Sequence, residues 1–282
     1  MNKRTIQDAR GSLFEPYSTT PRIVSLVPSI TELLFDLGLD VEAIVGRTKF
    51  CTQPSDKVKD VPWVGGTKDF KIDRIQGLRP DLVLANIDEN PKDRTLFIER
   101  KLKKTKVFAT EVNTYDDALA MINDLGRLLQ KGKEAKRIID SITALREKLP
   151  QKPIASALYL IWKRPYMSVS PGTYIDDMMR ISGYENVISE DWLANREYSS
   201  SGKRRYPEIA EKDILTLNPD RILLSSEPYP FKEKHIIELT ETLSAYDPSY
   251  ANTVRISIVD GRDFSWFGSH LISALKAFSA LH

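Results

Sequence analysis

The feature of this sequence that most constrains its fold is a short segment that occurs twice. The segment from Asp73 to Leu84 returns, without a gap, from Lys212 to Leu223. The residues that coincide are Ile75/Ile214, Leu78/Leu217, Pro80/Pro219, Asp81/Asp220 and Leu84/Leu223. Each copy predicts a short amphipathic helix, a Pro-Asp turn and a buried strand. Two such copies predict two similar lobes with a cleft between them, where small ligands bind.

Strands alternate with helices in both halves of the chain. A buried strand at 22–27 precedes a helix from Pro28, and a strand at 157–162 precedes a helix at 173–181. Ser29 and Glu32 have the spacing of a capping box for the first helix. This order predicts an α/β fold with mainly parallel sheets. We expect an N-terminal α/β lobe at 1–112 and a C-terminal α/β lobe at 151–282.

A long helical pattern separates these halves. Apolar residues keep a helical spacing from 114 to 149, and Pro150 ends the pattern. One helix of this length would extend roughly 50 Å. We therefore predict a single long helix, within 113–150, that links the two lobes. The alternative is two helices with a break near Gly132.

The overall composition excludes several classes of protein. The net charge of +2 arises from 41 basic and 39 acidic residues, which gives no reason to expect nucleic acid as a partner. No apolar run is long enough for membrane insertion. The basic N-terminus is not followed by an apolar h-region, which predicts a cytoplasmic protein, or a periplasmic one if the leader is missing. Cys51, the one cysteine, excludes an internal disulfide, and we expect a monomer.

Four motifs and the linking helix together resemble a known family, the class III or helical-backbone metal receptors. These are substrate-binding proteins of ABC importers, and they include vitamin B12- and siderophore-binding proteins. The motifs are Arg22–Glu32, Val64–Gly66, Ile72–Val83 and Val259–Gly268. The resemblance implies two α/β lobes joined by one rigid helix, with the ligand held in the cleft between them.

Within this family the sequence is most similar to cobalamin binders, whose cleft is lined with aromatic side chains. The residues at the corresponding loops are Phe50, Trp63, Trp162, Tyr166, Tyr206 and Trp266. A corrinoid or haem is a broad, largely apolar plate that aromatic faces can bury. The alternative for each residue is ordinary core packing. Asn86 departs from the family pattern, because the vitamin B12 receptor has a tryptophan there.

Few residues suggest direct contact with a metal. His270 follows the last family motif and is a candidate axial ligand to a metal complex, or simply a polar residue at a helix N-terminus. His235, His270 and His282 lack the spacing of a protein-only metal site, so we expect none. Cys51 could ligate a soft metal, or be a thiol without function.

The resemblance also implies a docking surface. Members carry an acidic residue on each lobe that pairs with arginines of the permease. Asp73 occupies one of these positions, whereas Lys212 occupies the other and is flanked by Glu211. Asp73 and Glu211 are therefore the docking candidates, although the reversed sign at Lys212 would weaken steering by a permease. The alternative is that these are solvated surface charges.

The sequence contains no nucleotide-binding loop and no nucleophile motif. We therefore expect a non-catalytic binding protein for a metal-bearing cofactor, without a cofactor of its own. Cobalamin or another corrinoid is the first candidate ligand, followed by a ferric siderophore or haem. The protein would be an ABC-importer component or a cytoplasmic relative. The alternative is an intracellular enzyme that acts on a corrinoid or another metal-loaded ligand in the same cleft.

Overall fold

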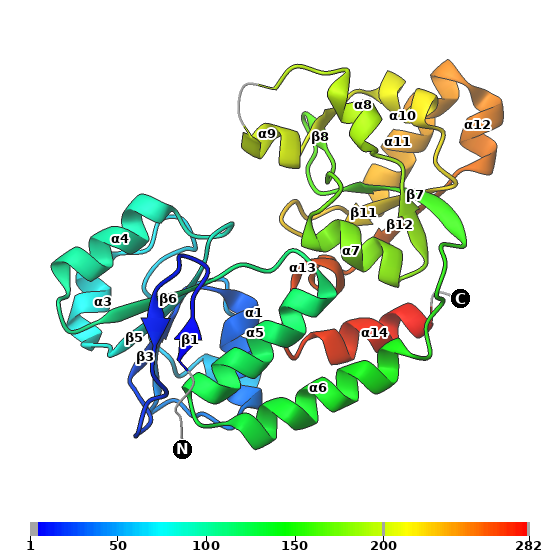
Figure 1. The fold of residues 1–282 in the computed structure, drawn as a ribbon. Coiled ribbons are helices and arrows are strands. Elements are labelled where there is room, and N and C mark those ends of the chain that lie inside the picture. Colours follow the sequence, from blue (N-terminus) through cyan, green and yellow to red (C-terminus); the bar gives the residue numbers. More distant parts are fainter. Residues whose placement is uncertain (1–4, 199–200, 281–282) are drawn as a thin grey trace. The chain divides into compact units, whose positions relative to one another are not determined.

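The computed structural model describes residues 5–198 and 201–280 (Figure 1). These residues form two compact units. Unit 1 contains the described residues up to Val112, together with Asp116–Ala144 and Trp266–Ile272. Unit 2 contains Asn113–Tyr115, Leu145–Ser265 and the described residues from Ser273 onward. Each unit has its own four-stranded parallel sheet, which confirms the predicted fold class.

The sheet of unit 1 has the strand order β4-β3-β5-β6, and all of its neighbouring strands are parallel. Its strands are β3 (Ile23–Ser25), β4 (Ile44–Arg47), β5 (Leu82–Asn86) and β6 (Lys106–Thr110). Helix α1 (Pro28–Asp36) covers one face, and α3 (Ile72–Leu78) and α4 (Lys92–Lys101) cover the other (Figure 1). Strand β5 is buried along its whole length, as its continuous apolar run predicts.

The sheet of unit 2 repeats this arrangement. Its strand order, read in the matching direction, is β9-β7-β11-β12. Its strands are β7 (Ala155–Leu160), β9 (Tyr184–Asn186), β11 (Arg221–Ser225) and β12 (Arg255–Val259). Helix α7 (Tyr174–Ile181) lies on one face, and α10 (Glu211–Leu217) and α11 (Glu233–Tyr246) lie on the other (Figure 1).

The duplicated segment forms the same structure in both units. Each copy is a helix followed by a central strand, α3 and β5 in unit 1 and α10 and β11 in unit 2. The residue after each helix is left-handed, with φ of 48° at Arg79 and 46° at Asn218. A left-handed residue at this position ends a helix and redirects the chain. The helix, turn and strand that each copy predicted are therefore confirmed, and the two turns also share a left-handed residue.

The predicted single helix over 114–149 is wrong. The structure has two helices, α5 (Tyr115–Leu128) and α6 (Gly132–Arg146), and Gln130 between them has a φ of 57°. The two helices pack closely at this corner, because a Cβ atom added to Gly126 would lie 2.4 Å from that of Ala135. This contact within the fold cannot be read from helical periodicity, which continues across the break.

The remaining elements are short. Residues 5–14 form a hairpin of β1 (Ile6–Gln7) and β2 (Leu13–Phe14). Strand β8 (Tyr166–Met167) pairs with β10 (Glu208–Ile209). The other helices are α2 (Ser55–Val58), α8 (Glu190–Ala194), α9 (Ser201–Arg205), α12 (Pro248–Thr253), α13 (Gly261–Ser265) and α14 (Leu271–Ser279).

Candidate functional site

Two of the predicted aromatic residues lie in neighbouring loops of unit 1 that follow β4. Phe50 and Trp63 are 50% and 49% exposed, which is unusual for side chains of this size. The loop around Trp63 is held to β4, because the Arg47 N–H donates to the Pro62 carbonyl at 3.0 Å and the Val64 N–H donates to the Arg47 carbonyl at 2.7 Å. Phe50 and Trp63 are therefore not packed into the core, which was the alternative interpretation of these two residues.

Each of these rings carries a cation on one face. The Arg74 guanidinium lies 4.4 Å from the Trp63 ring centroid, and the Lys49 ammonium lies 4.9 Å from that of Phe50. Such contacts contribute about 0.5–1 kcal/mol at exposed sites. They restrain the rings while leaving much of each exposed. Neither cation was identified from the sequence, because the pairing depends on the loop fold.

The glycine pair of the Val64–Gly66 motif makes this loop geometry possible. Gly65 has a φ of 128°, and a Cβ there would lie 2.7 Å from the backbone of Phe70. A Cβ at Gly66 would lie 3.2 Å from the Phe50 ring and 2.1 Å from the Asp69 carboxylate. Side chains at these positions would therefore displace the loop that supports the two aromatic residues.

Unit 2 has one exposed member of the predicted set. Trp162, which follows β7, is 40% exposed and packs edge-on against Tyr229, with ring centroids 5.6 Å apart. Tyr229 in turn contacts Phe231 and His235. Tyr229 was not among the predicted residues, although its loop, like that of Trp162, follows a strand of the central sheet.

The other predicted aromatic residues are less accessible. Tyr166 is buried in the core of unit 2, and burial raises its pKa to about 12. Tyr206 is half-buried in the same unit. Trp266 is buried in unit 1. Their positions favour core packing for Tyr166 and Trp266, although a ligand role for all three stays a prediction.

His270 forms a buried pair with Glu32 in unit 1. Its Nδ1 lies 3.1 Å from the Glu32 carboxylate, and its ring is 5.4 Å from that of Trp266. An ionised carboxylate only accepts, so Nδ1 carries the proton in this pair. Glu32 therefore does not complete the predicted capping box. The N-cap of α1 is Val27, and the Ser29 hydroxyl makes no hydrogen bond.

Cys51 is a buried thiol rather than an accessible one. It is 1% exposed and lies 3.0 Å from the Thr31 hydroxyl and 3.1 Å from that of Thr48. Burial raises its pKa, so the thiol form is favoured. A buried, hydrogen-bonded thiol favours the alternative interpretation, in which Cys51 is a thiol without function rather than a metal ligand.

The two docking candidates lie at the starts of the duplicated helices. Asp73 is exposed, and the Lys101 ammonium 2.6 Å away lowers its pKa. Glu211 is partly exposed and lines a surface groove of about 770 Å³ in unit 2, together with Lys163, Arg164, Arg196 and Glu241. Both carboxylates are thus available at the surface, and their docking role stays a prediction.

Two kinds of feature are absent from the described residues. Across 5–198 and 201–280, no group of three or more His, Cys, Asp or Glu could hold a metal ion. No helix in the described part of the chain is long and apolar enough to cross a membrane. His282 lies outside the described residues.

Comparison with known families identifies the fold. The sequence matches the family described as periplasmic binding protein over residues 23–246, which is more than half of the chain. The chain belongs to the periplasmic binding protein family. The hairpin of residues 5–14 precedes the matched region of this binding protein.

Two relatives show what this binding protein is similar to. The vitamin B12-binding protein of Vibrio campbellii is 24% identical over 213 residues, which cover 72% of this chain and 70% of that protein. The high-affinity heme uptake system protein IsdE of Staphylococcus aureus is 24% identical over 224 residues, covering 77% and 70%. These relatives are binding or uptake proteins, so the expectation of a binding protein rather than an enzyme is confirmed at the level of the family.

Solved structures agree on the fold. The periplasmic vitamin B12-binding protein BtuF of Vibrio cholerae has a TM-score of 0.73 at 18% identity, covering 93% of this chain and 96% of that one. The periplasmic heme-binding protein RhuT of Roseiflexus sp. RS-1 has a TM-score of 0.73 at 20% identity, covering 93% and 97%. The predicted resemblance to this class of binding proteins is confirmed.

Proposed function

We propose that this binding protein takes a metal-bearing macrocycle as its ligand, with cobalamin or a related corrinoid as the first candidate. The observation that carries the proposal is the exposure of Phe50, Trp63 and Trp162 in loops that follow sheet strands. Loops after parallel strands are where α/β proteins bind ligands. A corrin ring presents a broad apolar face, and rigid aromatic rings bury such a face at low entropic cost. The vitamin B12-binding relatives support this choice.

The neighbouring cations suit the polar edges of such a ligand. Arg74 and Lys49 lie against the Trp63 and Phe50 rings, where the rings can pack on the macrocycle while the cations reach its periphery. Amide, phosphate and carboxylate groups at the edge of a macrocycle accept hydrogen bonds from both types of cation. In this proposal the metal ion is already part of the macrocycle when the macrocycle binds to the protein.

Haem is the second candidate, and the His270–Glu32 pair favours it. A histidine whose Nδ1 donates to a carboxylate has its other ring nitrogen oriented and made more basic, as metal-ligating histidines commonly are. Haem-binding relatives support the same candidate. His270 is only 7% exposed, so ligation would require the Trp266–His270 segment to move. A corrinoid, which needs no such movement, therefore remains first.

Competitive native mass spectrometry tests the proposal. The protein would be incubated with equal concentrations of hydroxocobalamin, haem and a ferric hydroxamate siderophore. We expect one retained mass, that of the cobalamin complex. Retention of haem would select the second candidate, and loss of that complex in His270→Ala but not in His235→Ala would assign the axial ligand. If none of the three is retained, the proposal is wrong.

We further propose that the protein delivers its ligand to an ABC permease through Asp73 and Glu211. The family is named for the periplasm, whereas a cytoplasmic protein would handle the ligand inside the cell. Fractionation of the host cells with an antibody against the chain decides between these compartments. A periplasmic protein would support delivery for import, and a cytoplasmic protein would overturn it in favour of intracellular handling of the same ligand.

A further inference from the structure

The N-terminal hairpin is fastened to unit 1 by a buried aspartate. Asp8 has a fully buried side chain, and its carboxylate accepts hydrogen bonds from the backbone N–H groups of Arg10, Ser12 and Ala109 at 3.0, 2.8 and 3.2 Å. The Ala9 N–H also donates to the Ala109 carbonyl at 2.8 Å. These bonds fix the hairpin turn against β6, although the hairpin lies outside the region matched by the family.

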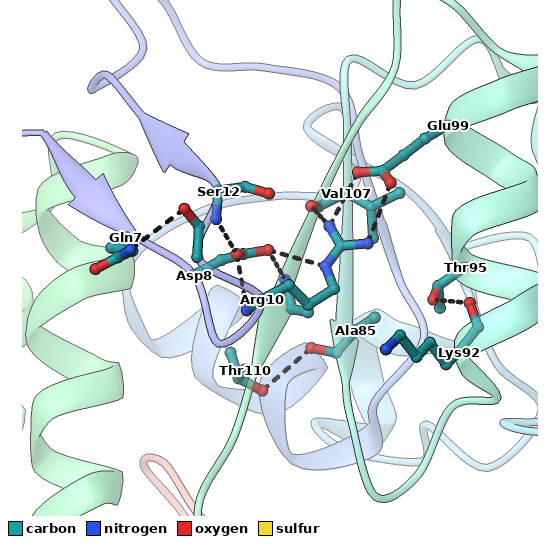
Figure 2. Close-up of polar contacts among 12 residues, drawn as sticks. Gln7, Asp8, Arg10, Ser12, Ala85, Lys92, Thr95, Glu99, Val107 and Thr110 are labelled. Carbon is teal, nitrogen blue, oxygen red and sulfur yellow. Dashed lines mark hydrogen bonds and ion pairs between the residues drawn. The ribbon is translucent and has the colours of Figure 1, made fainter.

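Arg10 extends the attachment to α4. Its Nη1 and Nη2 donate to the two oxygens of Glu99 at 3.1 and 2.9 Å, and its Nε donates to Asp8 at 3.1 Å (Figure 2). Nη2 also donates to the Val107 carbonyl. A bidentate arginine–carboxylate pair is among the stronger polar contacts in proteins. Asp8, Arg10 and Glu99, which we call the hairpin clamp, therefore hold the hairpin, β6 and α4 together.

The clamp closes one side of a cavity of about 480 Å³ within unit 1. Its volume is in the range of small-molecule sites. Small residues, Ala9, Ala85 and Ala109, line part of it, and Ile87 and Leu96 provide its larger apolar surface, which we call the apolar wall. Its uncharged polar lining consists of Ser12, Asn86, Asn90 and Thr95. Ile87 and Leu96 are 41% and 37% exposed, so a ligand could still bury apolar surface on both. The cavity is thus partly apolar and formed in advance by a rigid attachment.

Two cations and two anions surround this cavity, so their formal charges cancel, and one of the cations lacks a partner among the described residues. The titratable groups around it are Asp8, Arg10, Lys92 and Glu99. Arg10 is paired with both carboxylates, whereas no described residue forms a hydrogen bond or ion pair with the Lys92 ammonium. Figure 2 shows the Lys92 side chain extending from α4 toward Ala85. The cavity therefore combines one available cation with an apolar wall.

We propose that this cavity is a second ligand site, which binds a small aliphatic carboxylate. The carboxylate pairs with Lys92, and the hydrocarbon part packs on Ile87, Leu96 and the three alanines. A monoanion fits better than a dianion such as phosphate, because Lys92 can balance one negative charge, whereas Asp8 and Glu99 beside the same space would repel a second one more strongly. None of Phe50, Trp63 and Trp162 lines this cavity, whereas Asn86, at the position where the vitamin B12 receptor has a tryptophan, does. The inference goes beyond the proposed function because it assigns a different ligand to a cavity that those three aromatic residues do not line.

Calorimetry and methyl NMR of the full chain test this site, with hexanoate as the probe. We expect saturable binding with a Kd of about 1 mM or tighter. The methyl signals of Ile87 and Leu96 should shift, and hexylammonium, which has the same chain with the opposite charge, should not bind. Lys92→Gln should weaken hexanoate binding by at least about threefold, as expected for a partly exposed ion pair. Lys104→Gln, the same change outside the cavity, should leave it unaltered.

Three results would overturn the second site: no saturation by hexanoate, equal binding of hexylammonium, or wild-type affinity in Lys92→Gln. Cobalamin titration of Lys92→Gln separates this test from that of the proposed function. We expect that variant to bind cobalamin as the wild type does, because Lys92 lies outside the aromatic loops. Loss of cobalamin binding in Lys92→Gln would show one shared site and would also contradict the inference.

Discussion

The carboxylate of Asp220 accepts hydrogen bonds from the backbone N–H and the hydroxyl of Ser156, both at 2.8 Å. Asp81, its counterpart in the duplicated segment, accepts a hydrogen bond from the backbone N–H of Arg22 at the same distance. Each aspartate thereby joins the start of one central strand to the start of its neighbour. The duplication has kept a tertiary contact as well as a sequence pattern.

These aspartates should contribute measurably to stability. Asp220→Ala removes two accepted hydrogen bonds and should lower the free energy of unfolding by about 1 kcal/mol, since the site is exposed and hydrogen bonds there are partly replaced by water. Asp81→Ala, with one such bond, should cost less. Urea denaturation measures both. Asp60→Ala, an exposed aspartate without such a contact, is the control. An Asp220→Ala protein as stable as this control would contradict the role of the contact.

The sequence pattern predicted the parts of the fold that depend on local order. Strands β5 and β11 lie where the two copies of the duplicated segment placed them. The corner between α5 and α6 escaped prediction because it depends on the contact between Gly126 and Ala135. Glu32 was assigned to a cap because its actual partner, His270, is far along the chain.

The candidate site was predicted only in part, for the same physical reason. Residue type and loop position indicated Phe50, Trp63 and Trp162, which are exposed, but also Tyr166 and Trp266, which are buried. Burial depends on the packing of the whole unit. Arg74 and Tyr229 could not be chosen from the sequence, because only the folded loops bring them to the Trp63 and Trp162 rings.

The helix corner gives a second prediction. Gly126→Ala places a Cβ 2.4 Å from that of Ala135 and should reduce the free energy of unfolding by about 1–3 kcal/mol through overpacking. Gly77→Ala in α3 meets no atom within 4 Å and should be neutral or stabilise the protein by up to about 1 kcal/mol. Chemical denaturation of both variants checks this contrast. Equal effects of the two substitutions would mean that the corner tolerates the added methyl group.

The pH dependence of stability should reveal His235. Its Nδ1 accepts the Lys232 backbone N–H at 2.9 Å, and burial lowers its pKa from the usual value near 6.5. A group with a lowered folded pKa contributes stability above its unfolded pKa, and this contribution is lost as the pH falls. Wild-type protein should therefore lose more stability than His235→Gln when the pH falls below 6.5. Parallel thermal melts of the two proteins across this range provide the measurement. Identical pH profiles of the two proteins would show that His235 does not cause the loss of stability at low pH.

The docking proposal predicts that transport and ligand affinity can be separated. Asp73→Lys and Glu211→Lys reverse surface charges and should reduce uptake of labelled cobalamin by cells, since like charges would oppose the permease arginines. Neither substitution should change the affinity of the purified protein for its ligand. Asp140→Lys, a charge reversal on the exposed face of α6, is the matched control. Uptake that is unaffected by all three substitutions would exclude the proposed docking surface.

The most direct test of the central claim is an absorbance titration of the purified protein with hydroxocobalamin. We predict saturable binding by the wild type and affinities at least about tenfold weaker in Trp63→Ala and in Trp162→Ala, because each removes a large aromatic contact. Phe97→Ala removes an exposed aromatic ring from α4, outside these loops, and should bind as the wild type does. Failure of the wild type to bind cobalamin or haem, or undiminished binding in both tryptophan variants, would contradict the claim that these aromatic side chains hold a metal-bearing macrocycle.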